Sequence, residues 1–276
     1  MDLTDKRTIK KLLVKNRLWA KKSLGQNFLV DKEVLAKIIQ TAGLTKKDIV
    51  LEIGAGLGIL TQELCKKAKR VISIEKDEKL VAILKETCGN FKNLEIINDD
   101  VLSIENEKWS IKNYKIVANL PYNIAAPVLR KFLTAVNKPF LMVVMLQQEV
   151  AEKIISKPPK TNILALSVQA YGSPTISAYV KKESFWPKPK VDSTILKIKD
   201  IYRRIKIEEK KFFQILHIGF ASPRKKLLNN LSAGYQLEKE KVKKIFRLVH
   251  LSENIRAQEL SLSQWEELAS NLNKVL

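Results

Sequence analysis

Two hydrophobic patterns alternate along the first two thirds of the chain. Short runs rich in Val, Ile and Leu fit buried strands, and the segments between them carry apolar residues at the three- and four-residue spacing of amphipathic helices. The expected strands are 49–54, 70–75, 94–99, 115–120 and 140–146. Such alternation predicts an α/β fold, with a parallel sheet, helices on both faces and a ligand site at the carboxyl ends of the strands.

The pattern becomes helical after about residue 200. Residues 208–231, 238–249 and 261–276 all show helical spacing. Within the first of these segments, Ser222 is the expected N-cap of a helix whose first turn holds Pro223. The preceding residues 184–199 combine a proline-rich loop with a β-like run that we expect to rejoin the sheet. The prediction is therefore an α/β domain over residues 1–200, which carries a basic N-terminal extension, and a small all-helical domain over residues 201–276.

The net charge of the chain indicates a class of binding partner. The 276 residues include 50 Lys and Arg against 29 Asp and Glu, a formal net charge of +21. This excess favours a polyanionic partner such as a nucleic acid, although solubilising surface charge is the alternative explanation. The longest apolar run, 140–146, is far shorter than the roughly 20 residues of a membrane-spanning helix.

Cysteine usage and the N-terminus indicate a compartment. Cys65 and Cys88 form no CxxC or Cys/His cluster, so we expect neither a disulfide framework nor a metal site. The N-terminal segment lacks the uninterrupted apolar stretch of a secretory signal. We therefore expect a soluble protein in a reducing cytoplasm.

A glycine-rich turn follows the first expected strand of the sheet. Gly54, Gly56 and Gly58 lie between that strand and an amphipathic helix, where glycine lets the backbone pass close to a ligand. A dinucleotide fingerprint needs its third glycine at the position that Ile59 occupies, which argues against a pyrophosphate ligand. A tight structural turn remains the alternative.

Acidic residues end the next two strands. Glu75 ends the second, where a carboxylate can accept hydrogen bonds from both hydroxyls of a ribose. Asp100 follows the third, where it can accept from an adenine amino group while the neighbouring Val101 covers the ring. Taken singly, Glu75 can be a helix-start charge and Asp100 a turn residue. Together with the glycine turn they describe an adenosine ligand without phosphates, and S-adenosylmethionine fits that description.

The fourth strand ends in Asn119, Leu120, Pro121 and Tyr122. The Asn119 side-chain oxygen and the Leu120 carbonyl can accept the two hydrogens of an exocyclic amine, and Pro121 stiffens the loop. The Tyr122 ring offers a stacking surface for a base. A proline turn with a core tyrosine is the structural alternative.

A base held out of its stack also needs a second aromatic face. Phe185, or its neighbour Trp186, is the candidate for that face. Both can equally be core anchors.

These motifs, taken as a set and in this order, resemble the ribosomal RNA adenine N6-dimethyltransferases. The resemblance runs nearly end to end and is strongest for the kasugamycin-resistance branch, which acts on the small-subunit RNA. Its motifs are KKSLGQNFLVD (21–31), VLEIGAGLGILTQEL, VISIEKDEKL, NDDVLSI, VANLPYNIAAPVL, MLQQEVAEKI, PKPKVDS and PRKKLLNNL.

The resemblance implies a Rossmann-like S-adenosylmethionine-dependent methyltransferase core. In such a core Asn27 and Leu29 would close over the cofactor, Gly54 would line it, Glu75 would hold its ribose and Asp100 its adenine. From the residues alone, the segment containing Asn27 and Leu29 reads only as a loop before a helix capped by Asp31.

The resemblance also implies a target. Two adjacent adenosines in a hairpin near the 3′ end of 16S rRNA, within the immature small subunit, would each receive two methyl groups. Asn119 would serve both cofactor and target, with Leu120 and Tyr122 on the target base.

Basic residues at both ends of the chain would contact the RNA. The first 25 residues hold eight Lys or Arg against Asp2 and Asp5. The candidate RNA-binding residues are Lys21, Lys22, Arg224, Lys225 and Lys226.

Two other functions compete with this prediction. One is methylation of 23S rRNA adenine, of the macrolide-resistance type. The other is a ribosome-assembly or nucleic-acid-binding protein that retains the fold. We expect a monomer, since no extended apolar stripe is left over.

Overall fold

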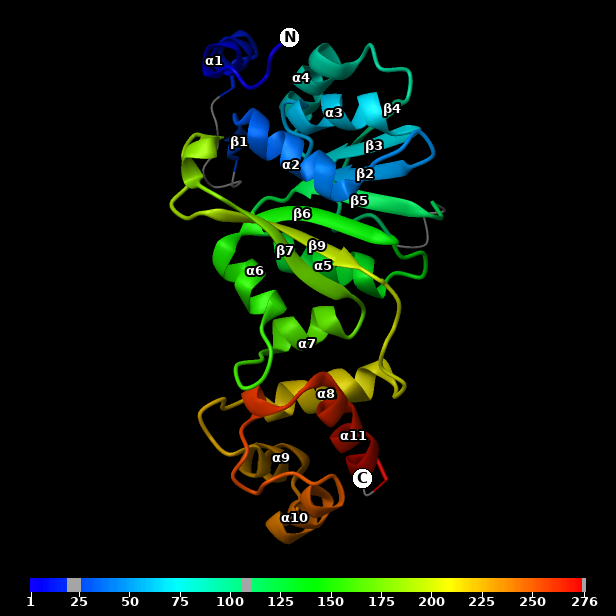
Figure 1. Ribbon diagram of the computed structural model, residues 1–276, viewed down its shortest axis with the longest axis vertical. Helices are drawn as coiled ribbons and strands as arrows, with labels where there is room; N and C mark the ends of the chain where they lie inside the picture. The colour runs from blue at the N-terminus through cyan, green and yellow to red at the C-terminus, as the bar shows by residue number, and fades with distance from the viewer. Residues whose placement is uncertain (19–25, 106–110, 275–276) are drawn as a thin grey trace. The chain divides into compact units, whose positions relative to one another are not determined.

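The apolar runs form one seven-stranded sheet (Figure 1). The computed structural model describes residues 1–18, 26–105 and 111–274. From edge to edge, the strands are β4 (Leu94–Asn98), β3 (Arg70–Glu75), β2 (Ile49–Ile53), β5 (Tyr114–Asn119), β6 (Leu141–Gln147), β9 (Ser193–Lys199) and β7 (Ser173–Val180). The five expected strands and the return of 184–199 to the sheet are thus confirmed.

The sheet is mixed rather than parallel throughout. Strands β2 to β6 run parallel, whereas β9 is antiparallel to both β6 and β7. A parallel crossover needs a connection long enough to pass over the sheet, usually through a helix, and the twelve residues 181–192 between β7 and β9 contain only the short helix η3 (Lys182–Ser184) and strand β8 (Phe185–Trp186). The five strands expected from the alternating pattern are therefore parallel, as predicted. The hydrophobic pattern reports burial and not strand direction, so it did not predict that strand β9 is antiparallel.

Helices cover both faces of the sheet. Right-handed crossovers from β2 to β3 and from β3 to β4 place their helices on one face, and the connection from β5 to β6 progresses the opposite way and places its helix on the other. Figure 1 shows α2 and α3 in front of the strands and α5 behind them. The helices are α2 (Lys32–Ala42), α3 (Ile59–Lys67), α4 (Glu78–Cys88), α5 (Ala125–Thr134) and α6 (Gln148–Ile155). Asp31 caps α2 as expected, accepting from the backbone N–H groups of Glu33 and Val34.

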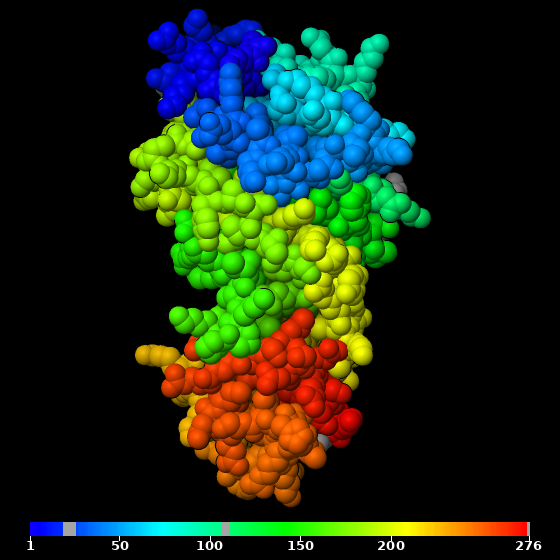
Figure 2. Space-filling view, viewed as in Figure 1, coloured from blue at the N-terminus to red at the C-terminus, as the bar shows by residue number. Residues whose placement is uncertain are grey.

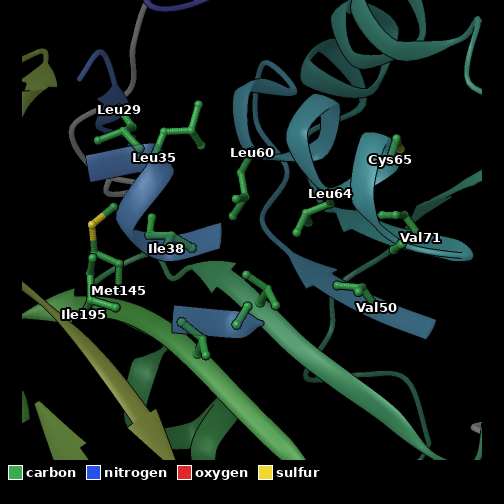
Figure 3. Close-up of a cluster of buried hydrophobic side chains, with 14 of the residues drawn as sticks. Leu29, Leu35, Ile38, Val50, Leu60, Leu64, Cys65, Val71, Met145 and Ile195 are labelled. Atoms are coloured by element: carbon green, nitrogen blue, oxygen red, sulfur yellow. The ribbon is translucent and has the colours of Figure 1, made fainter. Parts of the chain in front are cut away.

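The main hydrophobic core lies between the sheet and its front helices (Figure 3). Leu35 and Ile38 of α2 and Leu60 and Leu64 of α3 meet the sheet there. A side chain of this size contributes about 1.5–3 kcal/mol when fully buried. This packing fixes the strand ends on which the site is built.

A helix near the N-terminus packs beside the α/β layers; Figure 1 labels it α1, and its residues are dark blue in Figure 2. This helix, α1 (Lys6–Lys15), is capped by Asp5 and ion-paired to α4 by Lys15 Nζ and Glu86 Oε1 at 2.7 Å. Its buried face packs in a second core cluster with α4 and the glycine turn, and that cluster includes Ile9, Leu12, Leu13, Leu57, Leu80 and Ile83.

Residues 28 and 29 form a short strand, β1 (Phe28–Leu29), rather than the loop expected from the residues alone. This strand pairs antiparallel with β8, so that Phe28 opposes Trp186 and Leu29 opposes Phe185. A two-residue strand shows no periodicity in the sequence, and its partner is more than 150 positions away.

Contacts between Cα atoms divide the chain into two units. The first comprises Met1–Ala151 and Ser173–Ile201, and the second Glu152–Gly172 and Tyr202–Leu276. The division after residue 201 falls one position from the expected boundary, whereas residues 152–172 group with the C-terminal helices because α7 (Ile163–Gln169) packs on α8 (Glu209–Gly219).

The second unit is helical. Its other helices are α9 (Leu227–Tyr235), α10 (Lys239–Leu248), η4 (Ala257–Glu259) and α11 (Leu262–Leu272), which confirms the three helical segments expected after residue 200. Trp265 of α11 is fully buried and stacks on Phe220, with 5.6 Å between ring centroids. No helix in the described part of the chain is long and apolar enough to cross a bilayer.

The expected helix start at Ser222 and Pro223 is wrong. These residues lie in a turn closed by a hydrogen bond from Lys225 N to Ser222 O, and α9 begins only at Leu227. The Asn230 side-chain amide donates to the carbonyls of Gly219 and Ser222 at 2.6 and 3.1 Å. This side chain holds the connection between α8 and α9 in a turn and delays the helix.

Candidate active site

A cavity of about 460 Å³ opens at the carboxyl ends of the parallel strands. It lies where the strand order reverses, because the chain proceeds from β2 to β3 and β4 on one side and then returns to β5 on the other. The cavity is lined by every predicted cofactor and target-base residue: Asn27, Leu29, Gly54, Gly56, Glu75, Asp100, Val101, Asn119, Leu120, Pro121, Tyr122 and Phe185.

The glycine turn and the loop after β5 touch each other in this cavity. Gly54 has φ +73°, a conformation that L side chains rarely adopt, and a Cβ atom there would lie 3.2 Å from Pro121 Cδ. A Cβ at Gly54 would also come within 3.8 Å of the Asn119 carbonyl oxygen. Glycine therefore lets the two loops approach closely, so that ligands on either side of this contact would be neighbours.

Glu75 ends β3 with its carboxylate directed to the glycine turn. Its Oε2 accepts from Gly56 N at 2.9 Å and its Oε1 from Asp77 N at 3.0 Å, and the residue is 8% exposed. Burial raises the pKa of Glu75 above its ordinary value, against the lowering effect of these backbone N–H groups. Asp77, not Glu75, is the N-cap of α4. Each Glu75 oxygen keeps acceptor capacity for a ligand.

Asp100 lies beside the end of β4 and is shared between two partners. Its Oδ2 lies 2.8 Å from Lys76 Nζ, and its Oδ1 accepts from Leu102 N at 2.9 Å. The hydrogen bond with Lys76 is the largest of the effects that lower the pKa of Asp100. Asp100 therefore does stabilise a turn, as the structural alternative proposed. The neighbouring Val101, which is 4% exposed, adds an apolar wall to the cavity.

Asn119 presents a free carboxamide at the end of β5. Within residues 1–18, 26–105 and 111–274, no protein group hydrogen-bonds to this side chain, which is half-buried in the cavity. The loop beyond it is held by its backbone, since Leu120 N donates to Met145 O at 3.0 Å and Ile124 N to Pro121 O at 3.1 Å. A polar group in a rigid loop without a protein partner is suited to a ligand.

The aromatic candidates differ in burial. Tyr122 is half-buried, and its hydroxyl lies 2.8 Å from Ser193 Oγ. Phe185 is 2% exposed and belongs to the main core cluster, yet it also lines the cavity. Trp186 packs instead in the second cluster, where Lys10 Nζ lies 5.7 Å from its ring centroid.

The predicted RNA-binding residues fall into two groups. Arg224, Lys225 and Lys226 are exposed in the turn between α8 and α9. Lys21 and Lys22 lie outside the described residues.

The strand and motif patterns missed several polar residues of the site. Glu52 and Asp77 line the cavity, and Ser193 contacts Tyr122 from the start of β9. Glu52 lies within an apolar strand, and nothing in the sequence pattern marks it as a site residue. Asp77 and Ser193 belong to motifs already singled out, since Asp77 lies two positions after Glu75 and Ser193 ends the PKPKVDS motif.

The cavity is acidic in a strongly basic protein. Six carboxyl residues and one lysine line it: Glu52, Glu75, Asp77, Glu78, Asp99, Asp100 and Lys76. Among the described residues, no group of His, Cys, Asp and Glu could hold a metal ion. Such a lining disfavours phosphates and suits a cationic adenosine compound, so the residues fit S-adenosylmethionine.

The mixed sheet with its switch-point cavity, together with the glycine turn and the acidic residues Glu75 and Asp100, defines a Rossmann-like enzyme that binds a nucleoside cofactor. The family model for ribosomal RNA adenine dimethylase matches residues 17–274, and the chain belongs to that family. It is an S-adenosylmethionine-dependent rRNA adenine dimethyltransferase.

Individual relatives agree with this assignment. The chain is 41% identical over 255 residues to a ribosomal RNA small subunit methyltransferase A from Dehalococcoides mccartyi, an alignment that covers 91% of this chain and 88% of the relative. It is 37% identical over 278 residues to the protein of the same name from Alkaliphilus oremlandii, with 97% and 96% covered.

Solved structures share the fold. A dimethyladenosine transferase from Plasmodium falciparum superimposes with a TM-score of 0.77 at 25% identity, covering 90% of this chain and 98% of that one. The 23S rRNA methyltransferase ErmE superimposes with a TM-score of 0.71 at 24% identity, covering 90% and 100%, and shows a shared fold alone.

Proposed function

We propose that this protein dimethylates the N6 amines of two adjacent adenosines in a hairpin near the 3′ end of 16S rRNA, during assembly of the small subunit in the cytoplasm. The observation that carries the proposal is the close approach of the turn at Gly54 to Pro121, which leaves little room for a side chain at Gly54 and brings the proposed cofactor turn beside the proposed amine-binding loop. The names of the relatives from Dehalococcoides and Alkaliphilus support the small subunit as the source of the RNA.

The residues on the β2 to β4 side would hold the methyl donor. Glu75 would accept hydrogen bonds from ribose hydroxyls and Asp100 from an adenine amino group, with Val101 against the ring, and all three residues line the cavity. Gly54 and Gly56 would line the donor, and Asn27 and Leu29 would close over it. When bound, S-adenosylmethionine supplies an electrophilic methyl group on a positively charged sulfur.

The residues on the β5 side would hold the target. The Asn119 side-chain oxygen and the Leu120 carbonyl accept the two hydrogens of the adenine amine and stabilise the positive charge that develops on its nitrogen. Pro121 limits movement of the loop, and orientation of this weak nucleophile contributes much of the rate. Tyr122 and Phe185 would enclose the base, and stacking of this kind contributes about 1–3 kcal/mol per base.

Asn119 provides the first test of this assignment. We expect Asn119→Ala to lower kcat by roughly a hundredfold or more, as does loss of a group that stabilises developing charge, while it leaves the fold intact. Asn90→Ala is the matched control, because Asn90 is exposed in the turn after α4. Incorporation of labelled methyl groups into under-methylated small subunits measures the effect, and equal activity of both variants would refute the role of Asn119.

The same assay separates the competing functions. Purified small and large subunits are incubated separately with labelled donor, and the modified base is mapped. Label on adjacent small-subunit adenosines is expected, whereas label on a large-subunit adenosine would overturn the proposal in favour of 23S methylation. An Asn119→Ala protein that still binds the immature small subunit without methylating it would establish a separable assembly role.

Exposed basic residues of the second unit are proposed to bind the RNA backbone. Arg224, Lys225 and Lys226 stand on a turn held by Asn230, and Lys21 and Lys22 are proposed for the same role. Replacing Arg224, Lys225 and Lys226 with Ala should weaken RNA binding and reduce the slope of log K against log salt by about 1 for each phosphate that the protein no longer neutralises.

A charge-matched control exists at the end of α3. Lys66, Lys67 and Lys69 are exposed near the amino ends of the strands, on the edge of the sheet opposite the cavity. Replacing these three lysines with Ala removes the same charge and should leave the slope of log K against log salt mostly unchanged. Equal slopes for both triple variants would refute a localised RNA contact. We further propose that the protein acts as a monomer, which sedimentation at assay concentrations tests directly.

A further inference from the structure

The hydroxyl group of Tyr122 is bound to a side chain that the proposed chemistry does not use. Tyr122 Oη lies 2.8 Å from Ser193 Oγ, and either oxygen can donate. The two residues are 71 positions apart. Ser193 is fully buried, whereas Tyr122 is half-buried at the cavity.

The strand register explains how this bond forms. Asn119, the last residue of β5, pairs with Met145 of β6, and Gln147 at the end of β6 pairs with Ser193 of β9. Tyr122 lies three residues beyond Asn119 and therefore reaches across the end of β6 to the first residue of β9. The bond ties the loop after β5 to a strand two places away in the sheet.

Ser193 is a rigid anchor. It begins β9 and is paired on one side with Gln147 and on the other with Val180 of β7. The residue before it is also fixed, since Gln148 N donates to the Asp192 carbonyl at 3.0 Å and Lys182 N to Asp192 Oδ1 at 2.9 Å. The position of Ser193 Oγ is thus set by the sheet and not by a mobile loop.

We infer that Ser193 is a positioning residue, which holds the Tyr122 ring at the place where the target base stacks. The inference rests on the proposed function, in which Tyr122 forms one wall of the base slot. A tyrosine side chain attached only through its Cα can swing about the Cα–Cβ bond, and a hydrogen bond at the hydroxyl stops that swing and fixes where the ring lies. Misplacement of a reacting group by about 1 Å can cost a hundredfold in rate, so a fixed wall favours transfer.

The chemistry of the pair supports this role. Burial raises the pKa of Tyr122, and the hydrogen bond with Ser193 acts in the opposite direction. The phenol therefore stays protonated at neutral pH and serves as a neutral hydrogen-bonding group. A ring needed only for stacking has no use for a hydroxyl, whereas a ring that must be held in one place does.

The test is a double-mutant cycle on the intact protein. Tyr122→Phe and Ser193→Ala each remove the same hydrogen bond and keep the ring. We expect each to lower kcat on under-methylated small subunits by about five- to tenfold, the effect of one hydrogen bond, with donor Kd unchanged by calorimetry. The double variant should be no slower than either single variant. Ser193→Thr keeps the hydroxyl and should retain activity within about twofold.

Several outcomes would overturn the inference. Wild-type activity of Tyr122→Phe beside an impaired Ser193→Ala would mean that Ser193 serves the fold alone, and losses that multiply in the double variant would mean that the hydroxyls act separately. If Ser193→Ala does not fold, Tyr122→Phe alone decides the matter. Failure of the wild-type protein to methylate small subunits would instead count against the proposed function.

Discussion

Glu52 is a buried carboxyl group whose ionisation should make stability depend on pH. It lies in β2 and is 1% exposed, and its Oε2 accepts from Ser73 Oγ at 2.5 Å and Thr61 Oγ1 at 2.6 Å. Burial raises the pKa of Glu52 to about 7, although the two hydroxyl hydrogen bonds lower it, and the nearby Glu75 carboxylate raises it further.

The sign of the effect follows from these values. The fold favours the protonated form of Glu52, so its stabilising contribution is complete below about pH 4.5, the ordinary glutamate value, and is lost as the pH rises through about 7. At about 1.4 kcal/mol for each pH unit, the interval from 4.5 to about 7 corresponds to about 3 kcal/mol of unfolding free energy.

Glu52→Gln removes the titration and keeps the shape. Urea denaturation, followed by tryptophan fluorescence in the absence of donor, gives the free energy of unfolding of both proteins between pH 4.5 and pH 8. We expect the variant to gain about 3 kcal/mol relative to the wild type across that range, because the wild type alone must ionise a buried acid. Glu95→Gln is the control, since Glu95 is an exposed glutamate of the same sheet.

A constant difference between Glu52→Gln and the wild type would refute this reasoning. It would mean that Glu52 keeps one charge state from pH 4.5 to pH 8. Its surroundings would then be more polar, or more apolar, than the two hydroxyl groups and the packed sheet imply. A pH-dependent difference of the same size for Glu95→Gln would also refute it, since the effect would then not depend on burial.

Three further predictions concern other parts of the first unit. Gly54→Ala should lower kcat at least tenfold in the labelled-methyl assay, because its φ of +73° costs an L residue about 1 kcal/mol or more and its Cβ would press on Pro121; unchanged kcat would show that the two loops adapt. Glu75→Gln should weaken donor binding about tenfold or more in calorimetry, since a charged acceptor is lost, and an unchanged Kd would exclude it from the ribose site. Lys115→Met should destabilise the fold by about 3 kcal/mol in urea denaturation and leave donor Kd unchanged, because Lys115 Nζ binds Asp48 Oδ2 at 3.1 Å at the amino end of β5; a loss below 1 kcal/mol would contradict the importance of this buried pair.

The fold was predictable where burial leaves a periodic trace. Fully buried strands such as β2 and β3 read as apolar runs, and α8 and α10 as helical spacing. Strand β7 was not expected, since it contains Pro174 and most of its residues are only partly buried, which weakens the strand pattern. Strand direction leaves no periodic trace at all.

The lining of the cavity was predictable where polar residues stand at successive strand ends. Glu75 and Asn119 could be named because parallel strands bring their carboxyl ends to one edge. Contacts between distant segments could not be predicted from the sequence. The hydrogen bond between Tyr122 and Ser193 and the ion pair between Asp100 and Lys76 depend on how the strands are aligned in the sheet. The burial of Glu52 likewise depends on helices that pack over β2.

The first helix has a practical meaning for anyone who shortens this chain. The family match begins at residue 17, after α1 has ended, yet Leu3 and Ile9 line the same cavity as the glycine turn. A chain cut back to residues 17–274 would lose one wall of the cavity and expose the apolar faces of Leu57 and Leu80 to solvent. A shortened protein designed from the boundaries of the family match would therefore have a cavity more open to water than that of the full chain.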